Sequence, residues 1–378
     1  MALGVYVHLP FCPYICPYCD FAKWPHVRSR AASYLDALRS EIARTPLDDA
    51  HTIFFGGGTP NAYDGSEIAS LTSELLGRFS GNRTVREISI ELNPELVRDD
   101  DCARYARAGI TRISIGVQSF DPDEIRTLGR RHSFEDVKRA VALARSASIP
   151  SVSIDLMFGV PGQTLASWKR SLDVAIALDV DHISTYGLTV EEGTPYFGWQ
   201  AREPAAFASQ DLEAVLYECA IDRLESAGYA QYEISNFARE GHECAHNANY
   251  WANGEYIGLG VGAASYRGGV RSVHTRALEA YLDDVQAGRD IRAQAERLDP
   301  AAAAGEAIML ALRTAQGVDL AGFRERYGID VRARYEPVVS AFARDGFLTI
   351  DGARMALTKK GRFLANEVCA AFVSIPKA

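Results

Sequence analysis

The sequence predicts an α/β fold: a partial barrel of six β/α units, then an α+β extension and a C-terminal winged-helix-like domain. Two observations predict the barrel and the last domain. Short apolar runs alternate with amphipathic stretches through the first half of the chain, and helical patterns surround a hairpin signal near its end. The chain has 378 residues, of which 47% are hydrophobic and 24% charged, so it is long enough for two or three domains with buried cores.

The first half contains six strand candidates. Several of them are apolar on both faces, which is typical of buried parallel strands. Between the strands, apolar residues recur at helical spacing, as at Leu35, Leu38 and Ile42. Consecutive β/α units require right-handed crossovers, so the strands should form a parallel sheet that curls into a full or partial barrel. The expected strands cover residues 5–9, 52–55, 87–91, 112–117, 152–157 and 182–188.

The pattern changes after residue 188. A connection near residues 201–204 precedes a long expected helix over residues 212–227 and a polar, aromatic segment at residues 246–251. Near the end of the chain, two strand-like runs flank Asp351-Gly352, which is a strong two-residue turn signal. The sequence therefore predicts three domains, covering residues 1–200, 201–298 and 299–378.

Charge and hydropathy exclude several classes of protein. The chain has 40 Lys plus Arg against 49 Asp plus Glu, a net charge of −9, so bulk attraction to nucleic acid or anionic lipid is not expected. The first charged residue is Asp20, which leaves no basic region for a signal peptide. The apolar run over residues 256–266 is too short to span a bilayer. We expect a cytoplasmic protein with no integral membrane segment and no nucleic-acid partner.

Three of the seven cysteines, Cys12, Cys16 and Cys19, lie within eight residues. An odd, unevenly spread set does not indicate a disulfide framework in a chain of this length. Three thiolates on one loop can hold an iron–sulfur cubane that leaves one iron open to a further ligand. A zinc site needs a fourth ligand, which His8 or His26 would have to supply. The spacing favours the cluster, and zinc remains the alternative.

Further polar and glycine-rich features follow successive strands. Residues 56–60 (Gly-Gly-Gly-Thr-Pro) follow the second strand, Glu91 and Gln118 end the third and fourth, and Asp155 lies in the fifth. In barrels of parallel strands the active site gathers at the C-terminal ends of the strands. Successive glycine amides there could bind the carboxylate of an amino-acid-like ligand. A tight strand-to-helix turn explains the glycines equally well.

Together these motifs resemble a known superfamily. The Cys-x3-Cys-x2-Cys loop after the first strand, with the glycine run after the second, resembles the radical S-adenosylmethionine (SAM) superfamily. Other segments are similar to the oxygen-independent coproporphyrinogen III oxidase-like branch of that superfamily, and the similarity covers nearly the whole chain. The segments that carry it are residues 6–12, 116–119, 155–162, 232–238 and 246–251.

The resemblance implies a partial (β/α)6 radical-SAM barrel with two cofactors, a [4Fe–4S] cluster and SAM. By this resemblance Cys12, Cys16 and Cys19 are the iron ligands, and SAM binds the open iron. The positions that match SAM contacts of the family are Tyr6, Gly57, Gly58, Thr59, Glu91, Gln118, Arg130 and Asp155. Structural alternatives stay open for two of them. Arg130 could pair with a surface carboxylate, and Asp155 could accept hydrogen bonds from strand-end amides.

Phe21 separates two functions within this branch. The porphyrinogen-oxidising enzymes carry a fourth cysteine two residues after the third, where this chain has Phe21, and they also carry an N-terminal extension. The chain lacks both features and so is most similar to the heme chaperone subgroup, the HemW type. That resemblance implies a protein that binds heme and delivers it to apo-hemoproteins of the respiratory chain, reaching the membrane only through such partners. Oxygen-independent coproporphyrinogen III oxidase, an enzyme of porphyrin biosynthesis, is the alternative.

His246 is the leading candidate for the heme ligand. It opens the segment His246–Trp251, which matches the His-Asn-x-x-Tyr-Trp motif of the heme chaperone subgroup. A neutral imidazole is a good axial ligand for iron, and Tyr250 and Trp251 could cover a porphyrin face. A histidine that fixes a turn through hydrogen bonds is an equally good explanation, and Cys244 is a rival ligand. No catalytic residue is assigned, and a homodimer is compatible with the sequence.

Overall fold

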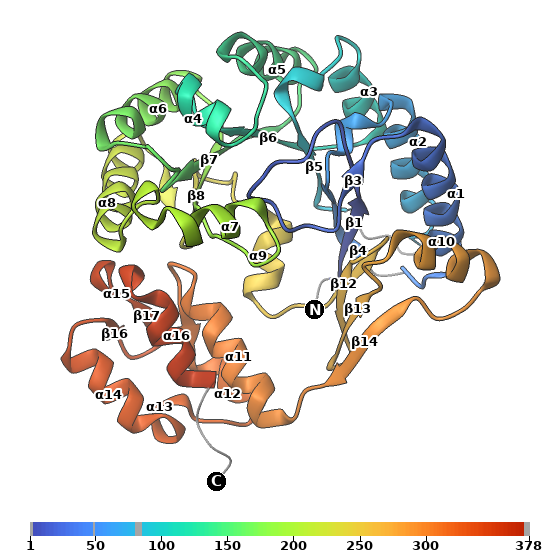
Figure 1. The fold of residues 1–378 in the computed structure, drawn as a ribbon. Helices are drawn as coiled ribbons and strands as arrows, with labels where there is room; N and C mark the ends of the chain where they lie inside the picture. Colours follow the sequence, from blue (N-terminus) through green and yellow to red (C-terminus); the bar gives the residue numbers. More distant parts are fainter. Residues whose placement is uncertain (1–2, 48–49, 80–84, 374–378) are drawn as a thin grey trace.

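The protein is built around one curved sheet that forms a partial barrel (Figure 1). The computed structural model describes residues 3–47, 50–79 and 85–373. Six strands at the centre of the sheet are parallel neighbours in chain order, which confirms the six expected β/α strands. These are β1 (Leu3–Leu9), β4 (Ala50–Gly57), β5 (Glu87–Leu92), β6 (Arg112–Gln118), β7 (Ser151–Phe158) and β8 (His182–Gly187).

Amphipathic helices cover the outer face of these strands (Figure 1). Side chains that the helical spacing marked as apolar, including Leu35 and Leu38, are fully buried against the sheet. Asp64, Ser133 and Thr164 begin three of the helices with capping boxes, which fix where each helix starts. The helices along this part of the chain are α1 (Arg28–Arg44), α2 (Gly65–Leu76), α3 (Asp101–Ala108), α4 (Pro122–Thr127), α5 (Phe134–Ser146), α6 (Leu165–Ala177), α7 (Pro195–Arg202) and α8 (Gln210–Ser226).

Strands from the second part of the chain extend the sheet at both edges. On one side, β8 pairs with β10 (Asn236–Ala238), which pairs with β9 (Ala230–Gln231). On the other side, β1 pairs in parallel with β11 (Tyr256–Leu259), and antiparallel strands continue the sheet from there. The remaining elements of this part are α9 (Ala245–Trp251), β12 (Ala264–Arg267), β13 (Val270–His274), α10 (Leu278–Ala287) and β14 (Arg292–Arg297), with the short pair β2 (Phe11–Cys12) and β3 (Trp24–Pro25) in the cysteine loop.

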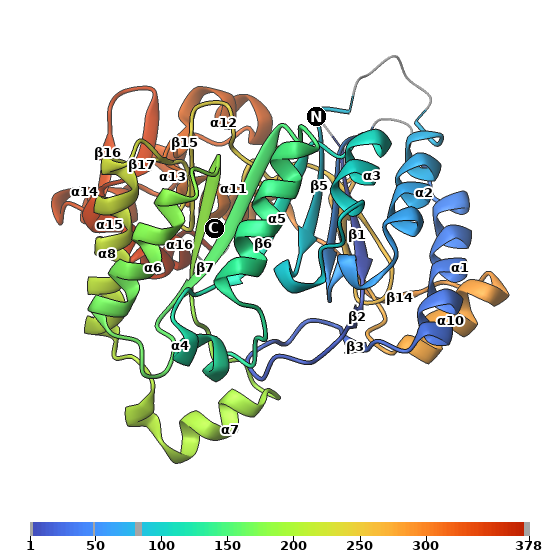
Figure 2. The same ribbon diagram turned by 90° about the horizontal axis from the view of Figure 1, so that it is seen from above.

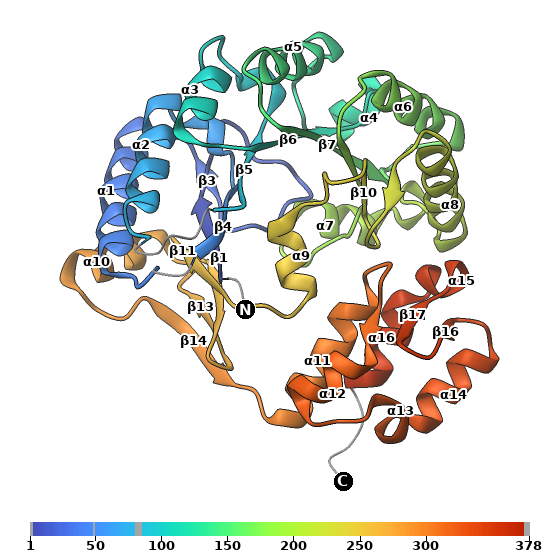
Figure 3. The same cartoon turned by 180° about the vertical axis from the view of Figure 1, so that it is seen from behind.

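The C-terminal part has helices around a small sheet and a hydrophobic core of its own. The expected hairpin is present: β16 (Leu348–Ile350) and β17 (Arg354–Leu357) flank Asp351-Gly352, and Gly352 has a φ of +99°. This part lies away from α1 and α2, and its first helix lies close to α9 (Figure 2 and Figure 3). Its other elements are α11 (Pro300–Leu312), β15 (Val318–Asp319), α12 (Leu320–Tyr327), α13 (Val331–Arg334), α14 (Glu336–Arg344), α15 (Lys359–Phe363) and α16 (Ala365–Val373).

Candidate cofactor and ligand site

Two adjoining cavities lie within the curve of the sheet. The smaller, of about 440 Å³, is lined by the cysteine loop, the glycine run and the C-terminal ends of β5, β6 and β7. The larger, of about 640 Å³, is lined by strands of the barrel together with α9, β12, β13 and α11. The residues that line both cavities are Phe21, Gly57, Glu91, Asp155 and Tyr186. The structure therefore brings most of the predicted site residues to one connected region.

The three clustered cysteines all line the smaller cavity. Cys12 is buried in β2, whereas Cys16 and Cys19 are half-buried on the loop that follows. Burial raises the pKa of Cys12 to about 11 and also raises that of Cys19, so both thiols are protonated at neutral pH unless a metal binds them. The ammonium group of Lys23 donates a hydrogen bond to the carbonyl of Cys19 and so ties down the end of the loop.

The donor set fits a cluster better than a single zinc ion. Among residues 3–47, 50–79 and 85–373, no three His, Cys, Asp or Glu side chains are grouped closely enough to hold one metal ion. His8 is unsuited as a fourth ligand because Nε2 lies 2.7 Å from the Ala22 carbonyl and Nδ1 lies 3.0 Å from the Tyr6 hydroxyl. Thiols that line one cavity without meeting at a point suit a group larger than one ion, as an iron–sulfur cubane is.

Close packing of backbone explains the glycine run. Gly58 donates its amide hydrogen to the Leu9 carbonyl at 2.9 Å, and a Cβ on Gly58 would lie 2.6 Å from the backbone of Pro10. Gly57 has a φ of +113°, and a Cβ there would meet the His8 ring. The tight-turn interpretation is therefore sufficient to explain why these positions are glycine. Both residues still line the smaller cavity, as does the buried Thr59.

Arg130 and Gln118 lie beside the cysteine loop. Arg130 is buried and donates hydrogen bonds to Asn93 Oδ1 at 2.8 Å and to the Gly116 carbonyl at 2.7 Å, with Nη1 4.0 Å from Cys16 Sγ. The expected alternative, a pairing of Arg130 with a surface carboxylate, is therefore wrong. Gln118 sits at a bulge in β6 with a φ of +67°, a conformation that costs about 1 kcal/mol or more outside glycine.

Glu91 and Asp155 are two carboxyl groups at the junction of the cavities. Burial and then the neighbouring Asp155 raise the pKa of Glu91 to about 8, so its neutral form dominates at pH 7. Burial also raises the pKa of Asp155. The Ser114 hydroxyl bonds to the Asp155 carboxylate, at 3.1 and 3.0 Å from its two oxygens. The carboxylate of Asp155 therefore bonds to a side chain. The alternative that the sequence left open was that it accepts hydrogen bonds from strand-end amides.

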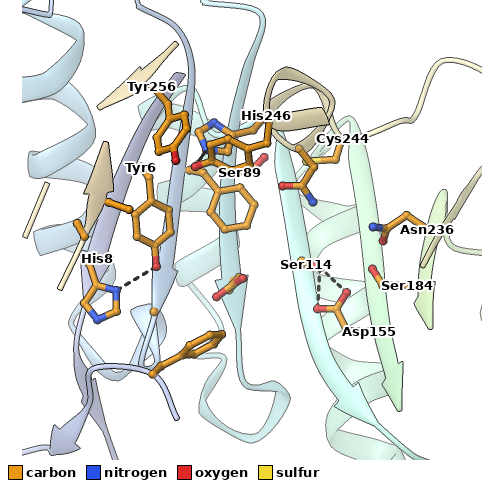
Figure 4. A pocket seen from close by; sticks show the side chains of 18 of the residues that line it. Tyr6, His8, Ser89, Ser114, Asp155, Ser184, Asn236, Cys244, His246 and Tyr256 are labelled. Carbon is orange, nitrogen blue, oxygen red and sulfur yellow. Dashed lines mark hydrogen bonds between the residues drawn. The ribbon is translucent and has the colours of Figure 1, made fainter. Parts of the chain in front are cut away.

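The larger cavity has an aromatic wall and a polar wall. Figure 4 shows Tyr6, His246 and Tyr256 on one side, and Ser114, Asp155, Ser184 and Asn236 on the other. On the aromatic side, Phe54 stacks on the His246 ring with centroids 5.2 Å apart. The Tyr250 ring contacts His246 at 4.8 Å and Tyr256 at 4.7 Å. Such a surface suits a flat, apolar ring system with polar groups at its edge.

His246 lines the larger cavity, and both of its ring nitrogens have partners. Nδ1 lies 2.8 Å from the Thr52 hydroxyl, and Nε2 lies 2.8 Å from the Tyr250 hydroxyl. Burial lowers the pKa of His246 to about 3, so the ring is neutral. The rival Cys244 also lines this cavity, but burial raises its pKa to about 12, which disfavours the thiolate. Trp251 is absent from the lining of both cavities.

Comparison with known proteins places the chain in a family. A sequence model of the radical SAM superfamily matches residues 6–175, and one of the HemN C-terminal domain matches residues 298–364. The heme chaperone HemW of Bacillus subtilis is 34% identical over 374 residues, which covers 98% of this chain and 99% of that protein. The chain belongs to the HemW family of the radical SAM superfamily. A HemW from Mycobacterium tuberculosis is 36% identical over 372 residues, covering 97% of this chain and 93% of the relative.

The fold of this HemW-family chain is similar to that of an enzyme of known structure. Coproporphyrinogen III oxidase (HemN) of Escherichia coli is 25% identical, with a TM-score of 0.86 over 99% of this chain and 90% of that one. The resemblance inferred from the motifs is therefore confirmed, including the oxidase-like branch and the HemW subgroup. In the part of the chain that the structure describes, no helix is both long and apolar enough to cross a membrane.

One wall of the larger cavity in this HemW-family protein could not be predicted from the motifs. Tyr256 and Arg271 reach the cavity from β11 and β13, and Glu306 reaches it from α11. The hairpin of β12 and β13 turns at Gly268-Gly269, a two-residue turn signal that could have revealed these strands. No local pattern could have shown that α11 packs beside them, because that contact depends on the tertiary fold.

Proposed function

We propose that this protein is a heme chaperone that binds heme in the larger cavity and delivers it to respiratory hemoproteins. The observation that carries the proposal is the 640 Å³ cavity, whose aromatic wall includes a neutral histidine. Its volume lies in the range of pockets that enclose small organic ligands. Relatives named heme chaperone HemW that align over nearly the whole chain support the same function.

The smaller cavity would hold the cofactors of the superfamily. In this proposal Cys12, Cys16 and Cys19 bind a [4Fe–4S] cluster, and SAM lies between the cluster and the strand ends. A cluster with SAM on its open iron supplies one-electron chemistry, for which the protein provides binding and orientation. The proposed SAM contacts are Gly57, Gly58, Thr59, Glu91, Gln118, Arg130 and Asp155, which line the smaller cavity, and Tyr6, which lines the larger one.

Arg130 and Glu91 contribute differently to this site. Arg130 places a buried positive charge beside Cys16, where it would offset the negative charge of a bound cluster and its thiolate ligands. Glu91 is largely neutral at pH 7 in the free protein, because burial and Asp155 oppose its ionisation. A cationic ligand group nearby would favour the ionised carboxylate, so binding of such a group would release a proton from Glu91.

His246 is the proposed heme ligand. Its neutral ring is suited to iron, but Nε2 is already bonded to the Tyr250 hydroxyl. Coordination through Nε2 therefore requires that hydroxyl to turn away. With Nε2 on iron the ring proton is on Nδ1, and the hydrogen bond that Nδ1 then donates to the Thr52 hydroxyl would keep the ring oriented, as an outer partner does for a metal-bound histidine.

A specific observation also favours the second candidate, oxygen-independent coproporphyrinogen III oxidase. The structure of the E. coli enzyme matches 99% of this chain with a TM-score of 0.86, and a porphyrinogen is similar in size to heme. Phe21 argues against this activity. Its side chain is 59% exposed and lines both cavities, at the position where the resemblance leads us to expect a fourth cysteine in the oxidases.

One sample tests both candidates. The protein is reconstituted anaerobically with iron and sulfide, then divided between a heme titration and a porphyrinogen assay with SAM and a reductant. We expect saturable heme binding, about four irons for each chain and no protoporphyrinogen. Formation of protoporphyrinogen would show that the protein is the oxidase and not the chaperone. Colourless protein with one zinc would support a zinc-stabilised binding module.

The remaining parts of the proposal concern organisation and location. We propose that residues 1–200, 201–298 and 299–378 are the barrel, the extension and the C-terminal domain. We also propose that the protein acts in the cytoplasm and meets membrane-associated recipients through its own surface. Size-exclusion chromatography with and without heme tests whether loading produces a homodimer.

A further inference from the structure

An ion pair in the lining of the larger cavity connects the extension of the sheet to the C-terminal part. Arg271, on β13, donates a hydrogen bond from Nη2 to a carboxylate oxygen of Glu306, on α11. Arg271 Nη1 also lies 3.6 Å from Glu296 Oε1. The second oxygen of Glu306 is buried and has no hydrogen-bond partner among the described residues. One side of this ion pair is therefore incompletely satisfied, which is costly for a charged group.

Arg271 differs from the two other arginines that line this cavity. Arg112 is buried and donates from Nη1 to the Ser151 hydroxyl and the His242 carbonyl, both at 2.9 Å, while its Nη2 has no hydrogen-bond partner among the described residues and so no carboxylate to exchange. Arg276 donates to the carbonyl of Asp20 at the end of the cysteine loop. Arg271 alone among these three bonds directly to a carboxylate side chain that another carboxylate could replace.

The surroundings of Arg271 suit a ligand that is flat and anionic at one edge. Tyr266 lies opposite Arg271 in the register of β12 and β13, and Tyr256 lies opposite Tyr266. All three line the larger cavity, and Tyr256 continues into the ring contacts that lead to His246. A ring system lying on this aromatic wall would bring an attached carboxylate toward the guanidinium.

We propose that Arg271 binds a carboxylate of the ligand, and that this carboxylate displaces Glu306 from the guanidinium. The inference rests on the proposed function, in which the ligand is heme, a planar ring with two propionate groups. A guanidinium binds a carboxylate through two parallel hydrogen bonds, a geometry that a free propionate can adopt. The exchange keeps the guanidinium of Arg271 paired throughout, and its cost is the displaced carboxylate of Glu306, which must reach solvent or take up a proton.

Glu306 then acts as an internal competitor. It holds the place of the propionate in the free protein and returns when heme leaves, which favours release to a recipient. Other contacts keep α12 against the extension during the exchange: Arg326 donates to the Ala252 carbonyl at 2.9 Å, and Asn253 donates to the Tyr327 hydroxyl at 3.2 Å.

The test compares heme with heme dimethyl ester, whose propionates carry no charge, by absorbance titration of the full-length protein. The variants are Arg271→Gln, Glu306→Gln and, as a control, Arg267→Gln. Arg267 lies on the neighbouring strand β12, is exposed and bonds to the Pro46 carbonyl outside the cavity. We expect the unchanged protein and the control to bind the ester about 10- to 100-fold more weakly than heme.

Arg271→Gln should remove this preference by weakening heme binding to the level of the ester. Glu306→Gln should tighten heme binding and leave ester binding unchanged. If Arg271→Gln weakens heme and ester binding equally, the role of Arg271 is structural. If it changes neither affinity, the carboxylate binds elsewhere, for example at Arg112, whose Nη2 has no partner among the described residues. Either result overturns the inference, and so does a Glu306→Gln variant that binds heme no more tightly. Absence of heme binding by the unchanged protein would instead overturn the proposed function.

Discussion

Replacing Glu91 by glutamine should change how the stability of the protein depends on pH. The pKa of Glu91 in the folded protein is about 8, compared with an ordinary value of 4.5. Because the folded-state value is the higher one, the stability that this group contributes is complete below pH 4.5. It is lost as the pH rises through 8. The difference corresponds to about 5 kcal/mol, of which about 3 kcal/mol falls between pH 5 and pH 8.

The assay is denaturant unfolding of metal-free protein, followed by intrinsic fluorescence at several values between pH 5 and pH 8. In Glu91→Gln the loss of unfolding free energy over this interval should be smaller by about 3 kcal/mol than in the unchanged protein. A residual loss is expected because burial also raises the pKa of Asp155. Glu192→Gln, at an exposed position, serves as the control. Parallel pH profiles for the unchanged protein and Glu91→Gln would refute the reasoning.

Three further predictions concern the two cavities. His246→Ala should weaken heme binding without loss of iron, whereas Tyr250→Phe should strengthen it because Nε2 of the histidine is then free; absorbance titration measures both. Cys16→Ser should prevent assembly of the iron–sulfur cluster during anaerobic reconstitution, as followed by iron analysis and visible absorbance. Gly58→Ala should lower the free energy of unfolding by about 1–3 kcal/mol, because its Cβ would lie 2.6 Å from neighbouring backbone.

Each of these predictions has a control and an outcome that contradicts it. Unchanged heme titration in His246→Ala would remove that residue as a ligand, and weaker binding in Tyr250→Phe would mean that the hydroxyl itself contacts heme. Cys102→Ser, in a helix outside both cavities, should retain the cluster; loss there as well would point to misfolding. In Gly77→Ala the nearest atom to the new Cβ is the Ser73 carbonyl oxygen at 3.4 Å, an ordinary contact, so stability should change by less than about 0.5 kcal/mol.

The barrel could be predicted because the sequence patterns that mark its strands and helices are local. Each parallel strand is a short apolar run, and apolar residues recur at helical spacing between the strands, so six units could be placed in order. The place of the site followed from topology, because parallel strands bring their C-terminal ends to the same edge of the sheet. This is why the cysteine loop, the glycine run, Glu91 and Asp155 could be expected together, and the structure brings them to the same two cavities.

Long-range contacts set the limits of that prediction. Strand β11 inserts beside β1 although about 250 residues separate them in sequence, and no pattern in either segment shows the pairing. The same holds for the bond between Arg271 and Glu306, and for Tyr250, whose hydroxyl holds the ring of His246. The glycine run shows a different limit: sequence identifies a position that excludes side chains, but only the structure shows that Pro10 causes the exclusion.

Three residues that line the smaller cavity reduce the stability of the fold, and this is itself evidence for a binding site. A buried carboxyl group with a pKa near 8, a glutamine at positive φ and an arginine whose Nε lacks a partner among the described residues each cost free energy in the empty protein. The three residues come from different strands or the loops after them, so no single packing requirement explains all of them. A ligand that paired a cationic group with the ionised carboxylate of Glu91 and accepted a hydrogen bond from Arg130 would recover part of that free energy. Ligand binding should therefore raise the free energy of unfolding of the protein.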